Sequence, residues 1–232
     1  MRHVAPVPPS GADPAAPLLV VCALGPEVWA LRGGDWSGTG AVLLRTGMGR
    51  ARARRAVGGL LARPGYGALA VAGFGAALGP GVLPGDVIVA DSVRDAEGDA
   101  WSLDSAPALA AELRARGLTV HIGPHHTADH VVRGAERSAL HATGARAVDM
   151  EAAAVLAARA EAGSGLPAAV LRVVVDTPSR ELLRPGTLPA GLRAWRALRA
   201  TVPALAAWRR SVARDELKNR APQSSTLPQE AS

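Results

Sequence analysis

The amino-acid sequence predicts an α/β fold, arranged as a three-layer αβα sandwich. Short aliphatic runs such as "LLVVCAL" and "ALAVAGFG" lack polar residues at alternate positions, as expected of strands that are buried on both faces. Segments with helical spacing of apolar residues alternate with these runs. Such alternation is typical of domains in which helices cover both faces of one sheet.

The expected elements follow one another without a repeat. Helices are predicted at residues 50–62, 105–116, 134–142 and 151–161. A last helical region carries an apolar stripe from Leu192 to Val212, which favours packing against the core, and Pro203 is expected to kink it. Strands are predicted at "PLLVVCAL", "AVLLRTG", "ALAVAGFG", "DVIVADSV", "LTVHIG", "TADHVV" and "AAVLRVVVD".

The length of 232 residues fits one compact core, and we expect a single domain over residues 18–213. Residues 1–17 are proline-rich and residues 214–232 are polar, so they are predicted to be a disordered leader and a flexible tail. No apolar run reaches the roughly 20 residues of a membrane span, and the leader lacks the apolar region of a secretory signal. Cys22 is expected to be a buried, inert thiol. These features predict a cytoplasmic protein.

The composition disfavours two classes of function. The net charge of +6 is accompanied by one tyrosine and one phenylalanine, too few for a surface on which nucleic-acid bases stack. Four histidines fall close together, but they have no cysteine partner and fit no compact zinc pattern. We therefore expect neither nucleic acid nor a metal to bind; the histidines are His121, His125, His126 and His130.

Acidic residues and glycine-rich loops follow several predicted strands. Glu27 follows the first strand, Glu151 a later one, and Asp176 closes the last. The loops "TGMGR" and "AGFGAALGPG" follow the second and third strands. Because ligands of open α/β sheets bind at the carboxyl ends of strands, these groups are predicted to converge on one binding site.

Five segments occur in the order and spacing found in the nucleoside phosphorylase and nucleosidase superfamily, which the chain resembles from about Leu18 to Leu183. They are "CALGPEV", "TGMGRARA", "GFGAALGPGVLPGDVIVAD", "AVDMEAAAV" and "VLRVVVDTP". Within that superfamily the sequence looks most like the hopanoid-associated phosphorylases. The resemblance implies a central mixed sheet, no cofactor, a homo-oligomer that is most often a dimer, and release of adenine from adenosylhopane, a lipid-linked nucleoside.

The resemblance also implies a role for individual residues. Glu151 corresponds to a glutamate that binds the ribose hydroxyls, and Met150 would lie against the apolar face of the sugar. A carboxylate in that place stabilises the positive charge that develops on ribose as the glycosidic bond breaks. Asp176 matches an aspartate that protonates purine N7, and Glu27 matches a glutamate that activates water. Simple helix capping or turn formation remains an alternative for each carboxylate.

The resemblance implies roles for several further residues less directly. Asp149 stands where related nucleosidases carry glutamate, and it either faces the ribose 2′-hydroxyl or caps the following helix. Gly73 and Phe74 are implied to line the substrate pocket, and Val131 and Val132 to cover the purine, with Asp129 as a polar neighbour.

Phosphorylases of the superfamily bind phosphate through an arginine and a serine, whose positions Val71 and Phe74 occupy here. Neither side chain can hold an anion, which favours water as the nucleophile. An alternative anion site could be built from Arg45, Arg50 or Arg172.

Two other functions remain open at this point. One is cleavage of a small soluble nucleoside such as methylthioadenosine, S-adenosylhomocysteine or futalosine, and the other is nucleoside binding without catalysis. The stripe from Leu192 to Val212 has arginines beside it, so the last helical region is also of the kind that lies on a membrane surface.

Overall fold

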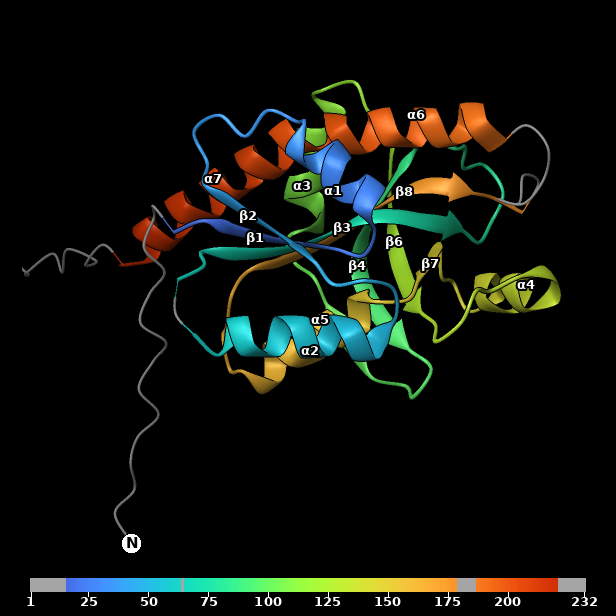
Figure 1. The fold of residues 1–232 in the computed structure, drawn as a ribbon, viewed down its shortest axis with the longest axis horizontal. Helices are drawn as coiled ribbons and strands as arrows, with labels where there is room; N and C mark the ends of the chain where they lie inside the picture. The colour runs from blue at the N-terminus through green and yellow to red at the C-terminus, as the bar shows by residue number, and fades with distance from the viewer. Residues whose placement is uncertain (1–15, 64, 179–186, 221–232) are drawn as a thin grey trace, which may run out of the picture.

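The computed structural model describes residues 16–63, 65–178 and 187–220 and confirms the α/β class (Figure 1). The strands are β1 (Leu18–Cys22), β2 (Ala41–Arg45), β3 (Ala68–Ala77), β4 (Val87–Asp95), β5 (Ala100–Ser102), β6 (Val120–Thr127), β7 (Ala147–Asp149) and β8 (Ala168–Asp176). The helices are α1 (Gly25–Arg32), α2 (Arg50–Leu61), α3 (Ala106–Arg114), α4 (Gly134–Ala142), α5 (Ala152–Glu161), α6 (Thr187–Ala200) and α7 (Val202–Arg220).

The sheet is mixed, and part of it closes on itself. β2, β1, β3 and β8 lie side by side and run parallel. β8 then pairs with β4 in the antiparallel sense, β4 pairs with β6 and β6 with β7 in the parallel sense, and β7 returns antiparallel to the end of β3. The cycle β3–β8–β4–β6–β7 therefore encloses side chains that an open sheet would place on one face.

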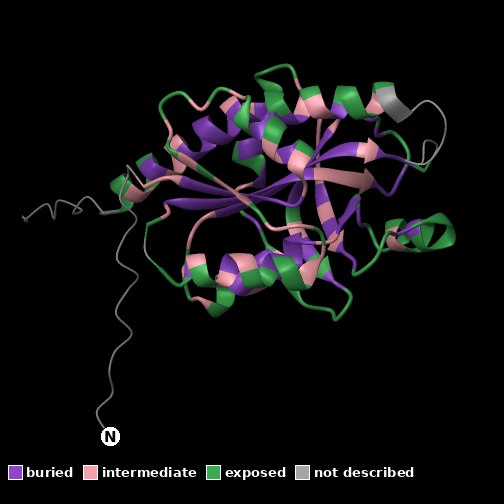
Figure 2. Cartoon of the chain, viewed as in Figure 1, coloured by how far each residue is buried: buried purple, intermediate pink, exposed green. Residues whose placement is uncertain are grey.

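Helices cover both faces of the sheet, as the sequence predicts (Figure 1). One hydrophobic cluster joins the sheet to α1, α3, α6 and α7 through side chains such as Leu31, Leu109, Leu198 and Trp208. A second cluster joins the opposite face to α2 and α5. β1, β3 and β8 are buried along most of their length, whereas α4 stands at the side of the molecule and is mostly exposed (Figure 2).

The structure corrects several predicted boundaries. The run "TADHVV" is not a strand, because β6 ends at Thr127 and the following residues form a loop. Residues 214–220, which the sequence predicts to belong to the tail, form the end of α7. Ala16, which was assigned to the leader, accepts hydrogen bonds from Arg209 through its carbonyl oxygen. Residues 1–15 and 221–232 lie outside the described part of the chain.

The predicted packing of the last helical region is confirmed. Its stripe contributes Leu198, Val202, Leu205 and Trp208 to the core, each almost fully buried. The region divides into two helices at Thr201, two residues before Pro203, which agrees with the expected kink. Within the described residues, no helix is both long and apolar enough to cross a membrane.

The contact between α1 and the start of α7 can be tested with one glycine. A Cβ atom at Gly34, just after α1, would overlap the side chain of Val202. Gly34→Ala should therefore lower the free energy of unfolding by about 1–3 kcal/mol. Gly58→Ala is the control, because Gly58 lies within α2 and its Cβ would meet open space, so alanine should stabilise by about 0.5–1 kcal/mol. Urea denaturation measures both changes, and equal effects would contradict the packing described here.

Candidate active site

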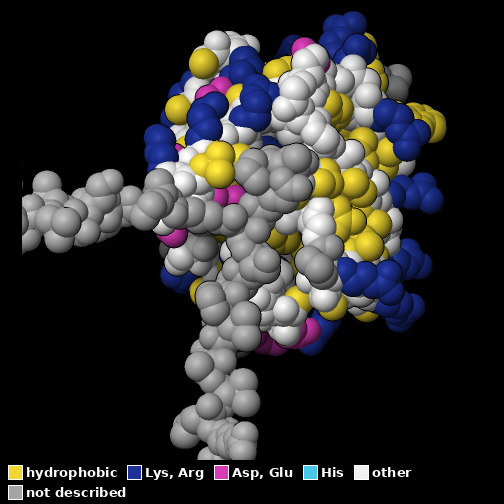
Figure 3. Space-filling view, turned by 90° about the vertical axis from the view of Figure 1, so that its left-hand side faces the viewer, with side chains coloured by type: hydrophobic (Ala, Val, Ile, Leu, Met, Phe, Trp, Pro, Cys, Tyr) yellow, Lys and Arg dark blue, Asp and Glu magenta, His cyan; other side chains and the backbone are white. Residues whose placement is uncertain are grey.

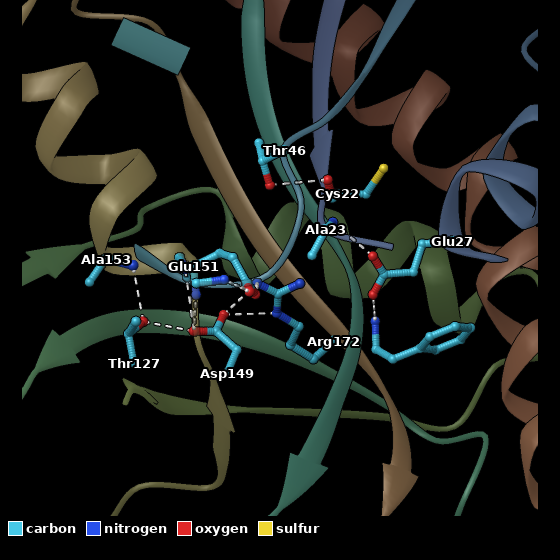
Figure 4. Close-up of polar contacts among 12 residues, drawn as sticks. Cys22, Ala23, Glu27, Thr46, Thr127, Asp149, Glu151, Ala153 and Arg172 are labelled. Carbon is cyan, nitrogen blue, oxygen red and sulfur yellow. Dashed lines mark hydrogen bonds and ion pairs between the residues drawn. The ribbon is translucent and has the colours of Figure 1, made fainter. Parts of the chain in front are cut away.

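The carboxyl ends of the parallel strands meet at one edge of the sheet, as expected from the sequence. Glu27 lies in α1 just after β1, and Gly73 and Phe74 lie in β3. Asp176 is the last residue of β8, and Glu151 is the residue before α5. Figure 4 shows Glu27, Asp149 and Glu151 approaching Arg172 from three different elements.

Glu27 is buried and held by the backbone on both sides of its carboxylate. Oε2 accepts hydrogen bonds from the amides of Ala23 and Leu24, at 2.8 and 2.7 Å. Oε1 accepts one from the amide of Phe74, at 2.7 Å. The bond to Leu24 caps α1, so the helix-capping alternative is correct. This cap does not exclude the predicted role of Glu27 in activating water, because the same carboxylate also faces β3.

Gly73 leaves room for two charged groups. A Cβ atom at this position would overlap Oε1 of Glu27 and would lie 2.8 Å from Nη1 of Arg172. The carboxylate of Glu27 and the guanidinium of Arg172 therefore both approach the same point on β3. The glycine predicted to line the pocket is needed at this position because any larger residue would displace these side chains.

Arg172 is the buried cation of the site. It lies in β8 with 1% of its surface exposed, and its Nε and Nη2 donate to Oδ2 of Asp149 at 2.8 and 2.5 Å. Nη2 also lies 3.8 Å from Oε2 of Glu151. Burial by itself would lower the pKa of Arg172, but the surrounding carboxylates, Asp149 first, raise it. Arg172 therefore stays charged and neutralises this cluster.

The carboxylate of Asp149 is bonded to other groups of the protein. Its Oδ1 accepts a hydrogen bond from the hydroxyl of Thr127 at 2.7 Å and longer ones, at 3.3 Å, from the amides of Glu151 and Ala152. Burial raises the pKa of Asp149, but the charges of Arg172 and His125 and the hydrogen bonds from Thr127 and Arg172 together outweigh it, so that the net pKa is lowered. The helix-capping alternative is confirmed, and both carboxylate oxygens are occupied by protein donors.

Glu151 connects two loops of the site. Its Oε1 accepts a hydrogen bond from the amide of Gly49 at 2.8 Å, and Gly49 has a φ of 96°, which favours glycine. This contact fixes the loop "TGMGR" against the start of α5. Burial is the main cause that raises the pKa of Glu151, and the negative charge of Asp149 adds to it, while Arg172 opposes it. Met150, between the two carboxylates, is partly exposed.

Asp176 has a partner that the sequence did not reveal. Arg137 of α4 donates from Nη2 to Oδ2 at 2.8 Å and from Nη1 to Oδ1 at 3.3 Å. Arg137 is only 3% exposed and is the one buried residue of α4. No feature of its spacing distinguishes it from the other arginines of the sequence. Both oxygens of Asp176 therefore accept hydrogen bonds from a guanidinium of the protein itself.

Val131 and Val132 lie differently from one another. Val132 is buried in a small cluster with Leu78, Ala128 and Val148, whereas the side chain of Val131 is 58% exposed. That the two valines cover a base stays a prediction. Asp129 is exposed and forms an ion pair with His130.

The histidines do not gather. His121 contacts Asp86, and His130 contacts Asp129 and Glu136. Among the described residues, no group of three or more His, Cys, Asp or Glu side chains is arranged to hold a metal ion. Cys22 is buried, and burial together with the charge of Glu27 raises the pKa of its thiol to about 12, so it is inert as predicted.

Most of the residues considered as ligands of a phosphate ion are either paired with carboxylates or buried in the core. Val71 is buried within the second hydrophobic cluster. Arg172 is paired with Asp149, and Arg50 binds Asp95 and Glu97. Arg45 is exposed, and its guanidinium lies against Gly25 at the start of α1. Of these arginines, Arg45 is the one that no described carboxylate pairs with.

A family comparison matches residues 19–188 to the phosphorylase superfamily. The chain belongs to this superfamily. Members of the superfamily with solved structures share the fold of this chain, but no curated protein matches it. The 5′-methylthioadenosine/S-adenosylhomocysteine nucleosidase of Neisseria meningitidis, in complex with methylthio-immucillin-A, aligns with a TM-score of 0.69 at 20% identity, over 83% of this chain and 98% of that chain.

Two further structures are similar to this phosphorylase-superfamily chain. Futalosine hydrolase of Helicobacter pylori aligns with a TM-score of 0.67 at 16% identity, over 87% of this chain and 98% of that chain. The 5′-methylthioadenosine/S-adenosylhomocysteine nucleosidase of Campylobacter jejuni aligns with a TM-score of 0.70 at 13% identity, over 83% and 98%. At these identities the likeness establishes the shared fold.

The buried ring of His125 should make stability depend on pH. Burial lowers its pKa from 6.5 to about 4, although the negative charge of Asp149 opposes the shift. Between these values the unfolded chain binds a proton that the folded protein does not, so stability falls as the pH is lowered through this window. A shift of this size corresponds to a loss on the order of 3 kcal/mol.

His125→Leu should remove this dependence, so its free energy of unfolding should change less between pH 6.5 and 4 than that of the wild type. His130→Gln is the control. Asp129 and Glu136 raise the pKa of His130, so its contribution is lost above pH 6.5 and its removal should leave the slope below that pH unchanged. Urea denaturation across this range measures the slopes; equal slopes for wild type and His125→Leu would show that the folded protein protonates the ring.

Proposed function

We propose that the protein hydrolyses the N-glycosidic bond of a purine nucleoside. The observation that carries this proposal is the approach of the Glu27 carboxylate and the Arg172 guanidinium to one point at Gly73, with Glu151 beside Arg172. A base, a cation and a second carboxylate at the carboxyl edge of an α/β sheet suit a reaction in which water attacks a carbon that becomes positively charged. Membership of the phosphorylase superfamily supports the same class of reaction.

The proposed roles of the three carboxylates are those that the sequence resemblance implies. Glu151 binds the ribose hydroxyls and stabilises the developing positive charge on the sugar. Glu27 takes a proton from water while the water oxygen bonds to C1′. The bond between C1′ and N9 breaks, its electron pair passes into the purine, and Asp176 donates a proton to N7 of the leaving base. Asp149 does not bind ribose in this scheme, because it positions Arg172 and α5.

Water is the proposed nucleophile because the usual phosphate ligands are replaced. Val71 is in the core, Phe74 contributes only its amide to Glu27, and Arg172 is neutralised by Asp149. Phosphate binding would need Arg45 to act without the partners that superfamily phosphorylases use. Hydrolysis is therefore favoured over phosphorolysis.

The proposed leaving group is adenine, and the proposed substrate is adenosylhopane, on the basis of the sequence resemblance given above. A second candidate is a small soluble nucleoside, which the names of the similar structures favour, since they include methylthioadenosine, S-adenosylhomocysteine and futalosine enzymes. The two candidates differ at the 5′ position. A panel of adenosines with 5′ substituents of increasing apolar length separates them.

We also propose a homo-oligomer, with a dimer as the simplest state. Hydrophobic side chains gather on one half of the face drawn in Figure 3, with Lys and Arg side chains along its outer border. Trp29 and Met48 are 69% and 56% exposed. Contiguous apolar patches on a protein surface mark sites of interaction with a partner or a membrane more often than single exposed side chains do.

The nucleophile is tested by measuring adenine release in buffer with and without phosphate. We expect release without phosphate and a free sugar as the second product. Glu27→Gln keeps the shape of the side chain but removes the base, so kcat should fall by about 10²-fold or more while KM stays within about 3-fold. Glu161→Gln removes an exposed carboxylate that pairs with Arg54 and serves as the control.

Strict dependence on phosphate, with a sugar 1-phosphate as product, would overturn the assignment of water as nucleophile. Tight nucleoside binding without any turnover would favour a binding protein in place of an enzyme.

A further inference from the structure

Arg137 covers the carboxyl group that acts on the leaving base in the reaction proposed above. Its Nη2 and Nη1 donate to Oδ2 and Oδ1 of Asp176 at 2.8 and 3.3 Å, and the two side chains are 3% and 11% exposed. A carboxyl group that acts on the purine has to present one of these oxygens to the base. At least one of the two hydrogen bonds therefore has to break before Asp176 can take part in cleavage.

The helix that carries Arg137 is attached to the rest of the protein by few side chains. Arg137 is the one residue of α4 that is buried, and Leu140 packs, partly buried, against a small cluster that includes Val132. By contrast, α5 buries six of its ten residues. Figure 1 shows α4 standing beside the body of the molecule. Segments with few buried apolar contacts open at a low cost in free energy, so α4 can move while the sheet stays folded.

A glycine with a positive φ stands at each end of α4. The φ angle is 53° at Gly134 and 91° at Gly144, and a Cβ atom at either position would meet no atom within 4 Å. Beyond these glycines the chain is fixed to the sheet, because the amides of Ala128 and Arg146 bond to carbonyl oxygens of β7 and β6. Glycine absorbs changes in φ and ψ at little cost, so the two glycines can serve as hinges for α4.

The contact of Arg137 with Asp176 also has a cost of its own. The Nε atom of Arg137 is buried and has no hydrogen-bond partner among residues 16–63, 65–178 and 187–220. A buried donor without a partner raises the free energy of the state that contains it. Turning the side chain into solvent hydrates Nε, which offsets part of the cost of breaking the ion pair.

We propose that Arg137 is the latch of a gate, which α4 and the loop before it, residues 128–133, form at the base end of the site. The latch occupies Asp176 when the gate is closed and leaves it when a purine enters. This inference rests on the function proposed above, in which Asp176 acts on the leaving base, and it adds the movement that this role requires. Arg137 is a positioning residue, since it acts through Asp176 and does not contact the substrate.

A latch of this kind competes with the purine for Asp176. Only the open fraction of the protein binds a purine, so the apparent dissociation constant equals the intrinsic constant divided by the open fraction. Removing the latch raises the open fraction and tightens binding. Removing a residue that contacts the base would weaken binding, and removing one that only packs α4 would not tighten it. The sign of the change in affinity therefore identifies a latch.

Calorimetry with adenine as the probe measures that sign. Arg137→Ala should bind adenine at least about 10-fold more tightly than the wild type. Arg137→Lys keeps the charge but lacks the fork that spans both carboxylate oxygens, so its affinity should lie between the two. Arg133→Ala removes an exposed arginine just before α4 and is the control, which should behave as the wild type. Equal or weaker binding of adenine by Arg137→Ala would overturn the proposal.

Hydrogen exchange tests the movement of α4 without any ligand. In Arg137→Ala the amides of α4 should exchange at least about 10-fold faster than in the wild type, whereas those of α5 should change by less than about 3-fold. Arg133→Ala should leave both helices unchanged. Faster exchange in both helices of Arg137→Ala would mean that the whole domain is loosened, and unchanged exchange in α4 would mean that Arg137 does not hold the helix. Either result would contradict the gate.

Turnover separates the gate from the function on which it rests. With an adenine nucleoside, Arg137→Ala should raise kcat/KM by about 3-fold or more through a lower KM. A fall in kcat of about 10-fold or more would make Arg137 part of the catalytic group and would refute its role as a latch. If the wild type neither binds adenine nor cleaves the nucleoside, the proposed function itself is refuted, and a gate for purines with it.

Discussion

The ion pair of Arg172 and Asp149 is the interaction on which the arrangement of the site depends. Both side chains are about 1% exposed and lie within the closed cycle of strands, Arg172 on β8 and Asp149 on β7. A buried charge without its partner is strongly destabilising. The pair therefore fixes the short strand β7 against β8, and with it the turn that presents Glu151.

This constraint explains why glycines occupy β3 beside the site. A Cβ atom at Gly73 would overlap Glu27, and one at Gly75 would lie 2.8 Å from the Cβ of Arg172. The segment "GFG" thus gives the guanidinium room to reach Asp149 and gives the amide of Phe74 access to Glu27. The two glycines of β3 therefore leave the room that the buried side chains of Arg172 and Glu27 occupy.

Much of the site was predictable because strand ends of a parallel sheet meet at one edge. That rule brought Glu27, Glu151 and Asp176 together from the sequence alone, and the helices on both faces followed from periodicity. The partners of these residues were not predictable. An arginine within the apolar run "VLRVVVD" signals a buried charge, but only the pairing of β3 with both β7 and β8 identifies Asp149 as its partner. Arg137 gave no signal, since it lies on an exposed helix whose position depends on a loop.

The dependence on Arg172 and Asp149 is tested most directly by a double-mutant cycle in urea denaturation. Arg172→Met should lower the free energy of unfolding by about 3–5 kcal/mol, because Asp149 is left buried and unpaired. Adding Asp149→Leu should recover a large part of this loss, since the second change removes the unpaired charge. Losses that simply add in the double variant would contradict the account, because they would show that the two side chains stabilise the fold independently.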